Sequence, residues 1–396
     1  MTATRTESDS LGSMSLPSGA LYGIATLRAH HNFNISPRKL GDSPELLRAL
    51  ARIKRAAART NRDLQVIPPD IADAICAAAA EVEEGRHAEH FIVDMMEGSG
   101  GTSTNMNMNE VLANRALQIL GDKPGKYDRI HPNDHVNTGQ STNDVVPSAI
   151  KLAIFEKSGD LLDVLKLLAD SLAERADVFG DVMRVGRTCL QSAQPMLLGQ
   201  AFGGYAAAVR RQYEGLQDIR KQLLVLPLGG TAIGTGLGAA PGYQSRVYRH
   251  LRDILGHPVT PANNMFDAMQ NADAFSRVSA EIRVCAEVVG KIASDLVILA
   301  SDPASGIGEL RLPPVQAGSS IMPGKTNPVL AMMVQQISFA IIGNDTAVSM
   351  ASLHGQLEIN HFEPVMATRI FDSLELAVRG WRIFSEHCVA RIEPRR

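Results

Sequence analysis

Apolar positions recur with a helical period over most of this chain. From residue 146 onward, aliphatic side chains follow one another in steps of three, four or seven residues, as at Ile150, Ile154, Leu161, Leu165 and Leu168. This spacing places them on one face of a helix. We therefore expect five long helices, the first from about 146 to a break at Gly186 and the others over about 195–223, 268–300, 329–353 and 364–390.

The first third of the chain carries the same signal in shorter pieces. Ser43, Pro44 and Glu45 suit an N-cap, a first-turn proline and an acid that complements the helix dipole. Pro68-Pro69 ends this helix, and an alanine-rich helix is expected over about 70–84. The polar residues 1–18 are expected to form a mobile tail. We expect an N-terminal helical domain over residues 1–130 and a central long-helix domain over residues 131–396.

No alternation of strands and helices appears along the chain. We therefore predict an all-α fold, an elongated bundle of long helices with active sites at helix ends and loops. One segment, 229–236, is as rich in glycine as a dinucleotide-binding loop. It lacks the GxGxxG spacing and follows an amphipathic helix rather than a strand, so we expect no cofactor there or elsewhere.

Composition narrows the possible partners. Only 20% of the 396 residues are charged, the net charge is −3 and 5% are aromatic, which argues against a nucleic-acid partner. The uncharged segment 326–344 is nearly long enough to span a bilayer, but it contains Asn327, Gln335, Gln336 and Asn344. We expect it to be a helix buried on all sides in the bundle, with no membrane span.

Cysteine and histidine usage gives no sign of a metal site or a disulfide. Cys76, Cys189, Cys285 and Cys388 are far apart and form no CxxC pair, and no HExxH spacing occurs. This usage is typical of a reduced, cytoplasmic and metal-free protein. The N-terminus has no basic region followed by an apolar run, so no signal peptide is expected.

Three polar loops interrupt the helical pattern. The first, 98–105, contains Thr102 and Ser103; the second, 131–144, contains Ser141, Thr142 and Asn143; the third, 318–328, contains Ser319, Ser320, Lys325 and Asn327. Glycine and proline exclude a regular helix or strand from the third loop. Hydroxyls, amides and backbone N–H groups near helix starts are suited to bind an anion.

The third loop leaves three interpretations open when its residues are considered alone. Ser319 and Ser320 beside Lys325 suit an activated serine, or a clamp for a carboxylate or phosphate. The same residues also suit a surface turn without chemistry. Functional residues are often found on loops, but most loops have no catalytic or binding role.

The segment from Gly318 to Asn327 resembles the signature loop of the aspartase/fumarase superfamily, Gly-Ser-Ser-x-Met-Pro-x-Lys-x-Asn. The resemblance implies that Ser319 is the general base and that Lys325 and Asn327 hold the substrate carboxylate. Ser320 and Met322 fall at substrate-binding positions of the same loop. The likeness extends over nearly the whole chain, from about residue 21 to 394.

The other polar segments resemble further conserved blocks of this family. By that resemblance, Thr102 and Ser103 contact the substrate, and Thr188 and Cys189 lie at substrate-binding positions of a block near 186–191. Two larger sets follow from the block at 131–144: Ser141, Thr142 and Asn143 bind the carboxylate and the leaving group, and His131, Asn133 and Asp134 match a second anion site in fumarases.

The resemblance implies a lyase that performs an anti elimination on a succinate-type substrate and releases fumarate. Segments around 228–237, 314–322 and 342–364 look closer to aspartases than to fumarases, which favours loss of ammonia or an amine from aspartate or a modified aspartate. A fumarate hydratase, a specialised lyase such as a nitrosuccinate lyase, and a silent structural relative are alternatives. The family also implies a small dicarboxylate substrate and a homotetramer with composite active sites.

Two positions depart from the family pattern. Family members carry His, or in some aspartases Gln, where this chain has Cys189, and a Glu that pairs with that His where it has Met332. Both halves of a polar pair are thus replaced by soft, weakly polar side chains. Neutral drift and a pocket retuned for a bulkier or less cationic leaving group both remain open. Family members usually continue into a small C-terminal domain, which we expect to be absent from this chain because it stops at Arg396.

Overall fold

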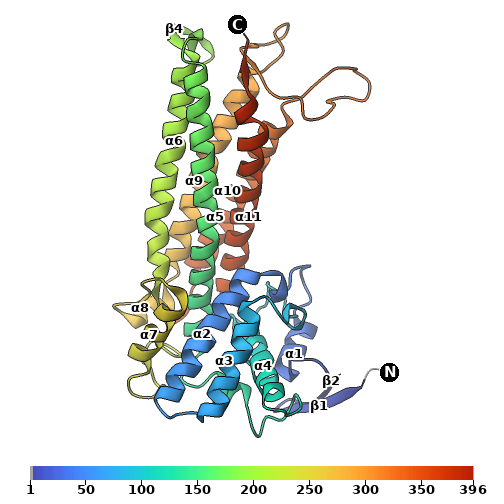
Figure 1. The fold of residues 1–396 in the computed structure, drawn as a ribbon, viewed down its shortest axis with the longest axis vertical. Helices are drawn as coiled ribbons and strands as arrows, with labels where there is room; N and C mark the ends of the chain where they lie inside the picture. The colour runs from blue at the N-terminus through green and yellow to red at the C-terminus, as the bar shows by residue number, and fades with distance from the viewer. Residues whose placement is uncertain (1–2, 396) are drawn as a thin grey trace. The chain divides into compact units, whose positions relative to one another are not determined.

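The computed structural model describes residues 3–395, and the chain divides into two compact units (Figure 1). Unit 1 consists of Met1–Glu156, Lys221–Phe275 and Val348–Thr368, and unit 2 of Lys157–Arg220, Ser276–Ala347 and Arg369–Arg396. Each unit gathers segments that are distant in sequence. The domain boundary expected after residue 130 stays a prediction.

Unit 1 is a cluster of shorter helices. They are α1 (Ile24–Asn32), α2 (Pro44–Asp63), α3 (Pro69–Glu83), α4 (Thr102–Ile119), α7 (Tyr243–Leu255) and α8 (Met265–Gln270), with 3-10 turns at Leu40–Asp42 and Ala88–His90, a π-helical turn at Pro132–Val136, and a parallel pair of short strands, β5 (Val225–Leu226) and β6 (Thr260–Pro261). The predicted proline boundaries are confirmed, because α2 begins at Pro44 and α3 at Pro69. The apolar face of α2, including Leu50 and Ile53, is fully buried, and α2 packs on α3 and α7.

Residues 4–17 form a hairpin, and the expectation of a mobile tail was wrong for them. β1 (Thr4–Asp9) and β2 (Gly12–Pro17) form an antiparallel hairpin. The Arg5 guanidinium donates to the carbonyl oxygens of Ala20 and Tyr22 at 2.7 and 2.8 Å and to the Glu7 carboxylate at 2.8 Å. Charge-assisted hydrogen bonds therefore hold this segment, and they leave no trace in the hydrophobic pattern.

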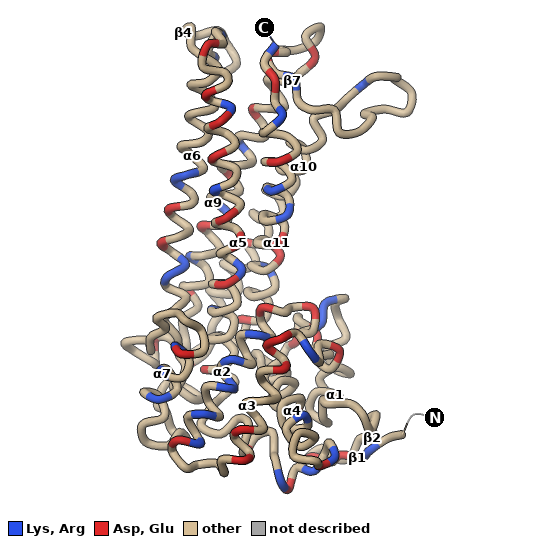
Figure 2. Tube along the Cα trace, viewed as in Figure 1, with Lys and Arg blue, Asp and Glu red and all other residues tan. Residues whose placement is uncertain are grey.

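Unit 2 contains the long helices, and the predicted all-α class is confirmed (Figure 1). They are α5 (Thr142–Val178), α6 (Leu198–Ile219), α9 (Asp273–Leu299), α10 (Val329–Leu353) and α11 (Glu363–His387). All of these helices except α6 begin or end with residues that belong to unit 1. Two 3-10 turns, Arg220–Leu224 and Val389–Arg391, follow α6 and α11. The helices are joined laterally, for example by Ser171 of α5 to Ser385 of α11 at 2.8 Å and by Tyr205 of α6 to Asp295 of α9 at 2.8 Å. Figure 2 shows both signs of charge interleaved along these helices.

Two expectations about the long helices need correction. The first long helix, α5, begins at Thr142 rather than near 146, and Pro147 lies inside it, where it removes one intrahelical hydrogen bond. The helix over 329–353 is not buried on all sides. Phe339 on α10 is 69% exposed, and Met332 and Ile342 are exposed on the same helix, although Val334 and Ile341 are buried.

The interruption near 186–191 is a β-hairpin that the helical pattern did not reveal. β3 (Met183–Thr188) pairs antiparallel with β4 (Gln191–Leu197), and β7 (Leu310–Arg311) pairs with β8 (Glu393–Pro394). Because β4 takes residues up to Leu197, α6 begins at Leu198 rather than at 195. No helix within the described residues has the length and apolar character needed to cross a membrane.

Candidate functional site

The first polar loop brings its backbone close to two neighbours in unit 1. Gly100 and Gly101 have φ values of 67° and 92°, in the left-handed region that glycine adopts without strain. A Cβ at Gly101 would lie 2.9 Å from the Val146 side chain, and one at Gly100 would lie 3.0 Å from Cβ of His361. Glycine is therefore required here by both conformation and space. α4 starts immediately afterwards at Thr102, so Thr102 and Ser103 lie in its first turn rather than in the predicted loop 98–105.

The two candidate hydroxyls at the start of α4 differ in their surroundings. Thr102 is exposed, whereas Ser103 is buried and its Oγ lies 2.8 Å from Oγ of Ser99. The Ser99 hydroxyl also donates to the Glu97 carboxylate, which in addition accepts the Ser99 N–H at 2.7 Å. Thr102 thus presents a hydroxyl to the surface, and Ser103 ends a chain of hydrogen bonds that leads to Glu97.

The loop carrying Ser141, Thr142 and Asn143 is held by the buried carboxylate of Asp144. Asp144 is 0% exposed and accepts backbone N–H bonds from Ser141 at 2.9 Å, Gly229 at 2.9 Å and Thr231 at 3.1 Å. Burial nevertheless raises the pKa of Asp144. The glycine-rich segment 229–236 therefore supplies N–H donors to this carboxylate rather than to a dinucleotide. Asp144 thereby anchors the loop carrying Ser141, Thr142 and Asn143 to this segment.

A buried lysine supports the same loop from α2. The Lys54 side chain is 0% exposed, and its Nζ donates to Oδ1 of Asn137 at 2.9 Å. Asn105 of α4 donates through Nδ2 to the same Oδ1 at 3.1 Å and to Oγ1 of Thr142 at 3.3 Å. Burial lowers the pKa of Lys54 to about 7. These contacts join the first and second polar loops within unit 1.

The sequence analysis did not select Lys54, Asn105 or Asn137 as functional candidates. A signal existed, because Lys54 lies beside Ile53 on an apolar helix face, where an unpaired charge is unfavourable. Only the structure identifies its partner, which is distant in sequence.

The expected second anion site is a single turn of π-helix in unit 1. His131 precedes it, and its Nδ1 accepts the backbone N–H groups of Asn133 at 3.2 Å and Asp134 at 3.3 Å. Asn133 and Asp134 themselves are exposed. Single π-helical turns often occur at functional sites, and this one presents two polar side chains to solvent.

The signature loop in unit 2 has neither helix nor strand from Gly318 to Pro328, as predicted. The N–H of Gly318 donates to the carbonyl oxygen of Lys325 at 2.7 Å, and Nδ2 of Asn327 donates to the carbonyl oxygen of Gly318 at 3.1 Å. These two bonds close the loop at its base. Ser320, Met322 and Lys325 are exposed, and Asn327 is half-buried.

Ser319 occupies a distinctive position in this loop. Its Oγ accepts the backbone N–H groups of Ile321 and Met322, each at 3.2 Å. Two N–H dipoles that converge on one oxygen stabilise negative charge on it. The hydroxyl that the family resemblance names as the base is therefore the one whose alkoxide the loop can stabilise.

Thr188 and Cys189 lie at the tip of the β3–β4 hairpin in unit 2. Thr188 pairs with Gln191, so Cys189 and Leu190 form a two-residue turn, with φ values of 52° and 61°. Such a turn favours Asn or Gly, and other residues are strained there. Thr188, Cys189 and Leu190 are all exposed. Met332 is also exposed, so neither departure from the family leaves a buried side chain unpaired within this chain.

The candidate residues are divided between the two units. Unit 1 holds Thr102, Ser103, His131, Asn133, Asp134, Ser141, Thr142 and Asn143, and unit 2 holds Thr188, Cys189, Ser319, Ser320, Met322, Lys325 and Asn327. Neither unit by itself contains both the candidate base and the Ser-Thr-Asn triplet.

Among the described residues, one histidine group has metal-ligand spacing. Ligand atoms of His87, Glu89 and His90 lie within 4.8 Å of one another. Nε2 of His87, however, lies 2.7 Å from the Glu81 carboxylate, which also accepts two hydrogen bonds from Arg115. These contacts explain the cluster without an ion, and we assign no metal to it.

Comparison with known proteins agrees with the resemblance seen in the sequence. A family model described as "Lyase" matches residues 12–343. An aspartate ammonia-lyase of Helicobacter pylori is 44% identical over 98% of this chain and 83% of its own. A fumarate lyase:delta crystallin of Brucella melitensis, solved bound to cobalt, has a TM-score of 0.97 at 43% identity and covers 99% of this chain and 85% of its own.

A more distant solved structure has the same fold. The class II fumarase of Schistosoma mansoni has a TM-score of 0.93 at 33% identity, covering 99% of this chain and 85% of that one. The chain belongs to the aspartase/fumarase superfamily of lyases.

Proposed function

We propose that this protein is a carbon–nitrogen lyase that eliminates ammonia, or an amine-like group, from aspartate or a modified aspartate and releases fumarate. The observation that carries the proposal is the convergence of two backbone N–H groups on Oγ of Ser319. The 44% identity to an aspartate ammonia-lyase supports the choice of leaving group.

The reaction begins with proton removal from the carbon next to a carboxylate. Ser319 Oγ takes this proton, as an alkoxide stabilised by the N–H groups of Ile321 and Met322. The electron pair moves into the neighbouring carboxylate, which becomes a dianion. Lys325 and Asn327 provide a cation and an amide donor to bind it, and this stabilisation lowers the barrier.

The carbon–nitrogen bond then breaks on the adjacent carbon, the new double bond forms, and ammonia departs. In this proposal, Thr102, Asn143 and Thr188 hold the departing group, and Ser141 and Thr142 bind the carboxylate. Nδ2 of Asn143 already donates to the carbonyl oxygen of Ala232 at 2.8 Å, which fixes its Oδ1 as the atom available to a protonated amine.

We also propose that the active form is a homotetramer with composite active sites. Two observations support this: the candidate residues are divided between two units, and α10 exposes Met332 and Phe339 seven residues apart with Ile342 nearby. A helix with an apolar stripe facing water requires a partner. A single species of monomer mass in light scattering at micromolar concentration would falsify the tetramer.

The compartment proposed is the cytoplasm. All four cysteines are free, and Cys189 is exposed at a hairpin tip, which suits a reducing environment.

A retuned substrate preference is the second candidate, and Cys189 and Met332 favour it. Soft side chains at both positions suit a leaving group that is bulkier or less cationic than ammonium, such as a substituted amine or a nitro group. The variant carrying Cys189→His and Met332→Glu should then shift preference toward plain aspartate and malate more than either single change. Wild-type turnover of aspartate at a kcat of about 10 per second or more contradicts this second candidate.

The test of the main proposal is the rise of fumarate absorbance when purified protein meets aspartate, malate or nitrosuccinate. Aspartate as the best substrate supports an ammonia-lyase, malate a fumarase, and nitrosuccinate the specialised alternative. No fumarate from any of the three would favour a catalytically silent relative.

A further inference from the structure

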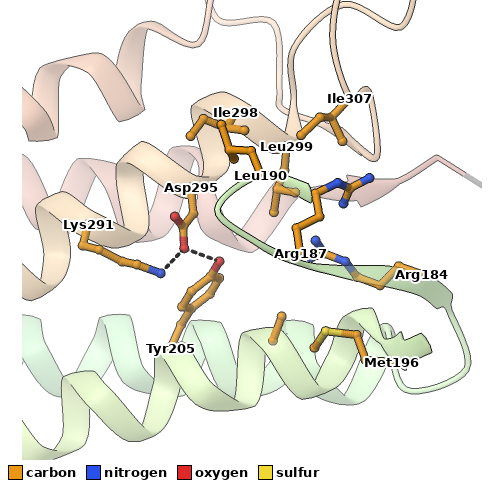
Figure 3. Close-up of a pocket in the computed structure, with 11 residues that line it drawn as sticks. Arg184, Arg187, Leu190, Met196, Tyr205, Lys291, Asp295, Ile298, Leu299 and Ile307 are labelled. Carbon is orange, nitrogen blue, oxygen red and sulfur yellow. Dashed lines mark hydrogen bonds and ion pairs between the residues drawn. The ribbon is translucent and has the colours of Figure 1, made fainter. Parts of the chain in front are cut away.

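A cavity of about 310 Å³ lies under the β3–β4 hairpin in unit 2 (Figure 3). Each of its charged side chains has a partner of opposite charge. Asp295 accepts a hydrogen bond from Tyr205 at 2.8 Å and is paired with Lys291, as the dashed lines in Figure 3 show. Arg184 and Arg187 both pair with Glu309, through Nε–Oε2 at 3.1 Å and Nη1–Oε1 at 2.6 Å. The two arginines therefore share one carboxylate, and this shared contact links their strand to Glu309.

A β-bulge lies opposite the part of β3 that carries both arginines. Between the Val185–Pro195 and Arg187–Ser192 pairs, β3 has one residue and β4 has two, so the extra residue lies in β4. Residues three apart in a regular strand point to opposite faces. The register between β3 and β4 shifts between Val185 and Arg187, and the intervening Gly186 is buried. A Cβ at Gly186 would lie 3.0 Å from the carbonyl oxygen of Gln194. The bulge increases the local twist of the hairpin, and both guanidinium groups reach Glu309.

Glu309 is itself fixed at the start of the segment that leads to the signature loop. Its carbonyl oxygen accepts the N–H of Arg395 at 2.9 Å, and the next residue, Leu310, pairs with Pro394 between β7 and β8. One residue therefore connects two elements of unit 2: its side chain contacts the strand that ends in Thr188, and its backbone directly precedes β7, the strand before Ser319.

We propose that Glu309 is a positioning residue, which clamps the hairpin carrying Thr188 to the base of the signature-loop segment. The predicted effect of the clamp on the reaction rate rests on the proposed function. The contact between Glu309 and the two arginines does not depend on that function. Arg184 is nearly buried, with a side chain 10% exposed, so loss of the carboxylate leaves charge without compensation. The strained turn at Cys189 and Leu190 then loses the contact that holds its strand.

The primary test compares Glu309→Gln with Glu393→Gln. Glu393 is an exposed neighbour that pairs with Arg311 across the same two short strands at 3.7 Å, and it serves as the matched control. We expect Glu309→Gln to lower kcat by about 10- to 100-fold, because small misplacements of reacting groups cost this much. KM should change less than kcat, and Glu393→Gln should match the wild type. Exchanging the charges, with Glu309→Arg and Arg187→Glu together, should restore more rate than either single variant has.

Amide hydrogen exchange provides a second measurement that needs no substrate. Glu309→Gln should speed exchange both in 183–197 and in 310–327, whereas Glu393→Gln should leave 183–197 unchanged. If the wild type forms no fumarate but this coupled exchange is seen, the proposed function fails and the clamp stands. Unchanged exchange in 183–197, or a loss of kcat that only follows a loss of folded protein, overturns the clamp.

Discussion

Two loops of this protein carry polar candidate residues of similar kinds, but they are anchored differently. The loop carrying Ser141, Thr142 and Asn143 is anchored by Asp144, whose buried carboxylate accepts three backbone N–H groups, and by contacts that lead to the buried Lys54. The signature loop carrying Ser319 is largely exposed and is closed by hydrogen bonds within itself, from Gly318 to Lys325 and from Asn327 to Gly318.

The difference reflects two tasks. A group that binds a substrate gains from a rigid frame, because the entropy of ordering it has already been paid in folding. A loop that carries a base must admit substrate and then exclude water, so an exposed segment with glycines is suited to close over it. We therefore expect changes in the loop carrying Ser141, Thr142 and Asn143 to lower both stability and rate. Changes in the signature loop should lower the rate alone.

The largest effect is expected at the signature loop. Ser319→Ala should lower kcat by about 10³-fold, which is within the usual range for loss of a general base. The unfolding midpoint should stay near that of the wild type, because the loop is exposed. Steady-state fumarate formation and a thermal melt measure both quantities. Thr326→Ala, which removes an exposed hydroxyl of the same loop, is the control for a loop hydroxyl as such, and a comparable loss there contradicts a special role of Ser319.

A smaller effect is expected from Asp144→Asn, which should change both the stability of the protein and its activity. The amide offers only one acceptor oxygen for three N–H groups and turns its own donors toward them, so we expect a loss of about 2–3 kcal/mol in unfolding free energy. Urea unfolding measures it, and KM for the substrate should rise because the triplet loop loosens. Asp134→Asn, an exposed acid of the same segment, should leave stability unchanged. Equal stability of the two variants would show that the loop does not depend on its buried carboxylate.

Low pH should destabilise the segment around Asp94, which precedes the first polar loop. Burial alone raises the pKa of Asp94, but hydrogen bonds from Met96, Ser36 and Lys39 outweigh it and lower this pKa to about 2. Because the folded-state pKa is below the unfolded value, the stabilisation is present above about pH 4 and is lost as pH falls toward 2. Asp94→Asn should cost about 2 kcal/mol at neutral pH and little near pH 2. Urea unfolding at several pH values tests this, and a loss of stability in Asp94→Asn that is equal at pH 7 and pH 2 would contradict it.

The smallest effect concerns the strained hairpin tip. Leu190→Gly should raise the unfolding free energy by up to about 1 kcal/mol, because glycine adopts φ near 61° without strain. The gain is offset in part by the greater freedom of glycine in the unfolded chain. Leu237→Gly, at another exposed leucine but without positive φ, should destabilise instead. If both variants are destabilised equally, the tip is not strained.

The sequence by itself determined the long helices and the loops between them. Helical periodicity found α5, α6, α9, α10 and α11, because a buried face must repeat every 3.6 residues whatever packs on it. Glycine and proline fixed the signature loop for an equally local reason, since they cannot continue a helix or strand there. The resemblance to a family rested on the same short segments, whose spacing needs no tertiary structure to be seen.

Only the tertiary structure decided which groups support the site. The partners of Lys54, Asp144 and Glu309 lie far away in the chain, and no period in a sequence encodes a contact between distant segments. The hairpins at 183–197 and 4–17 were missed for the same reason, because hydrogen bonds and ion pairs rather than apolar periodicity hold them. The exposed stripe on α10 was mistaken for a buried face, since a sequence shows which positions are apolar but not which neighbour covers them.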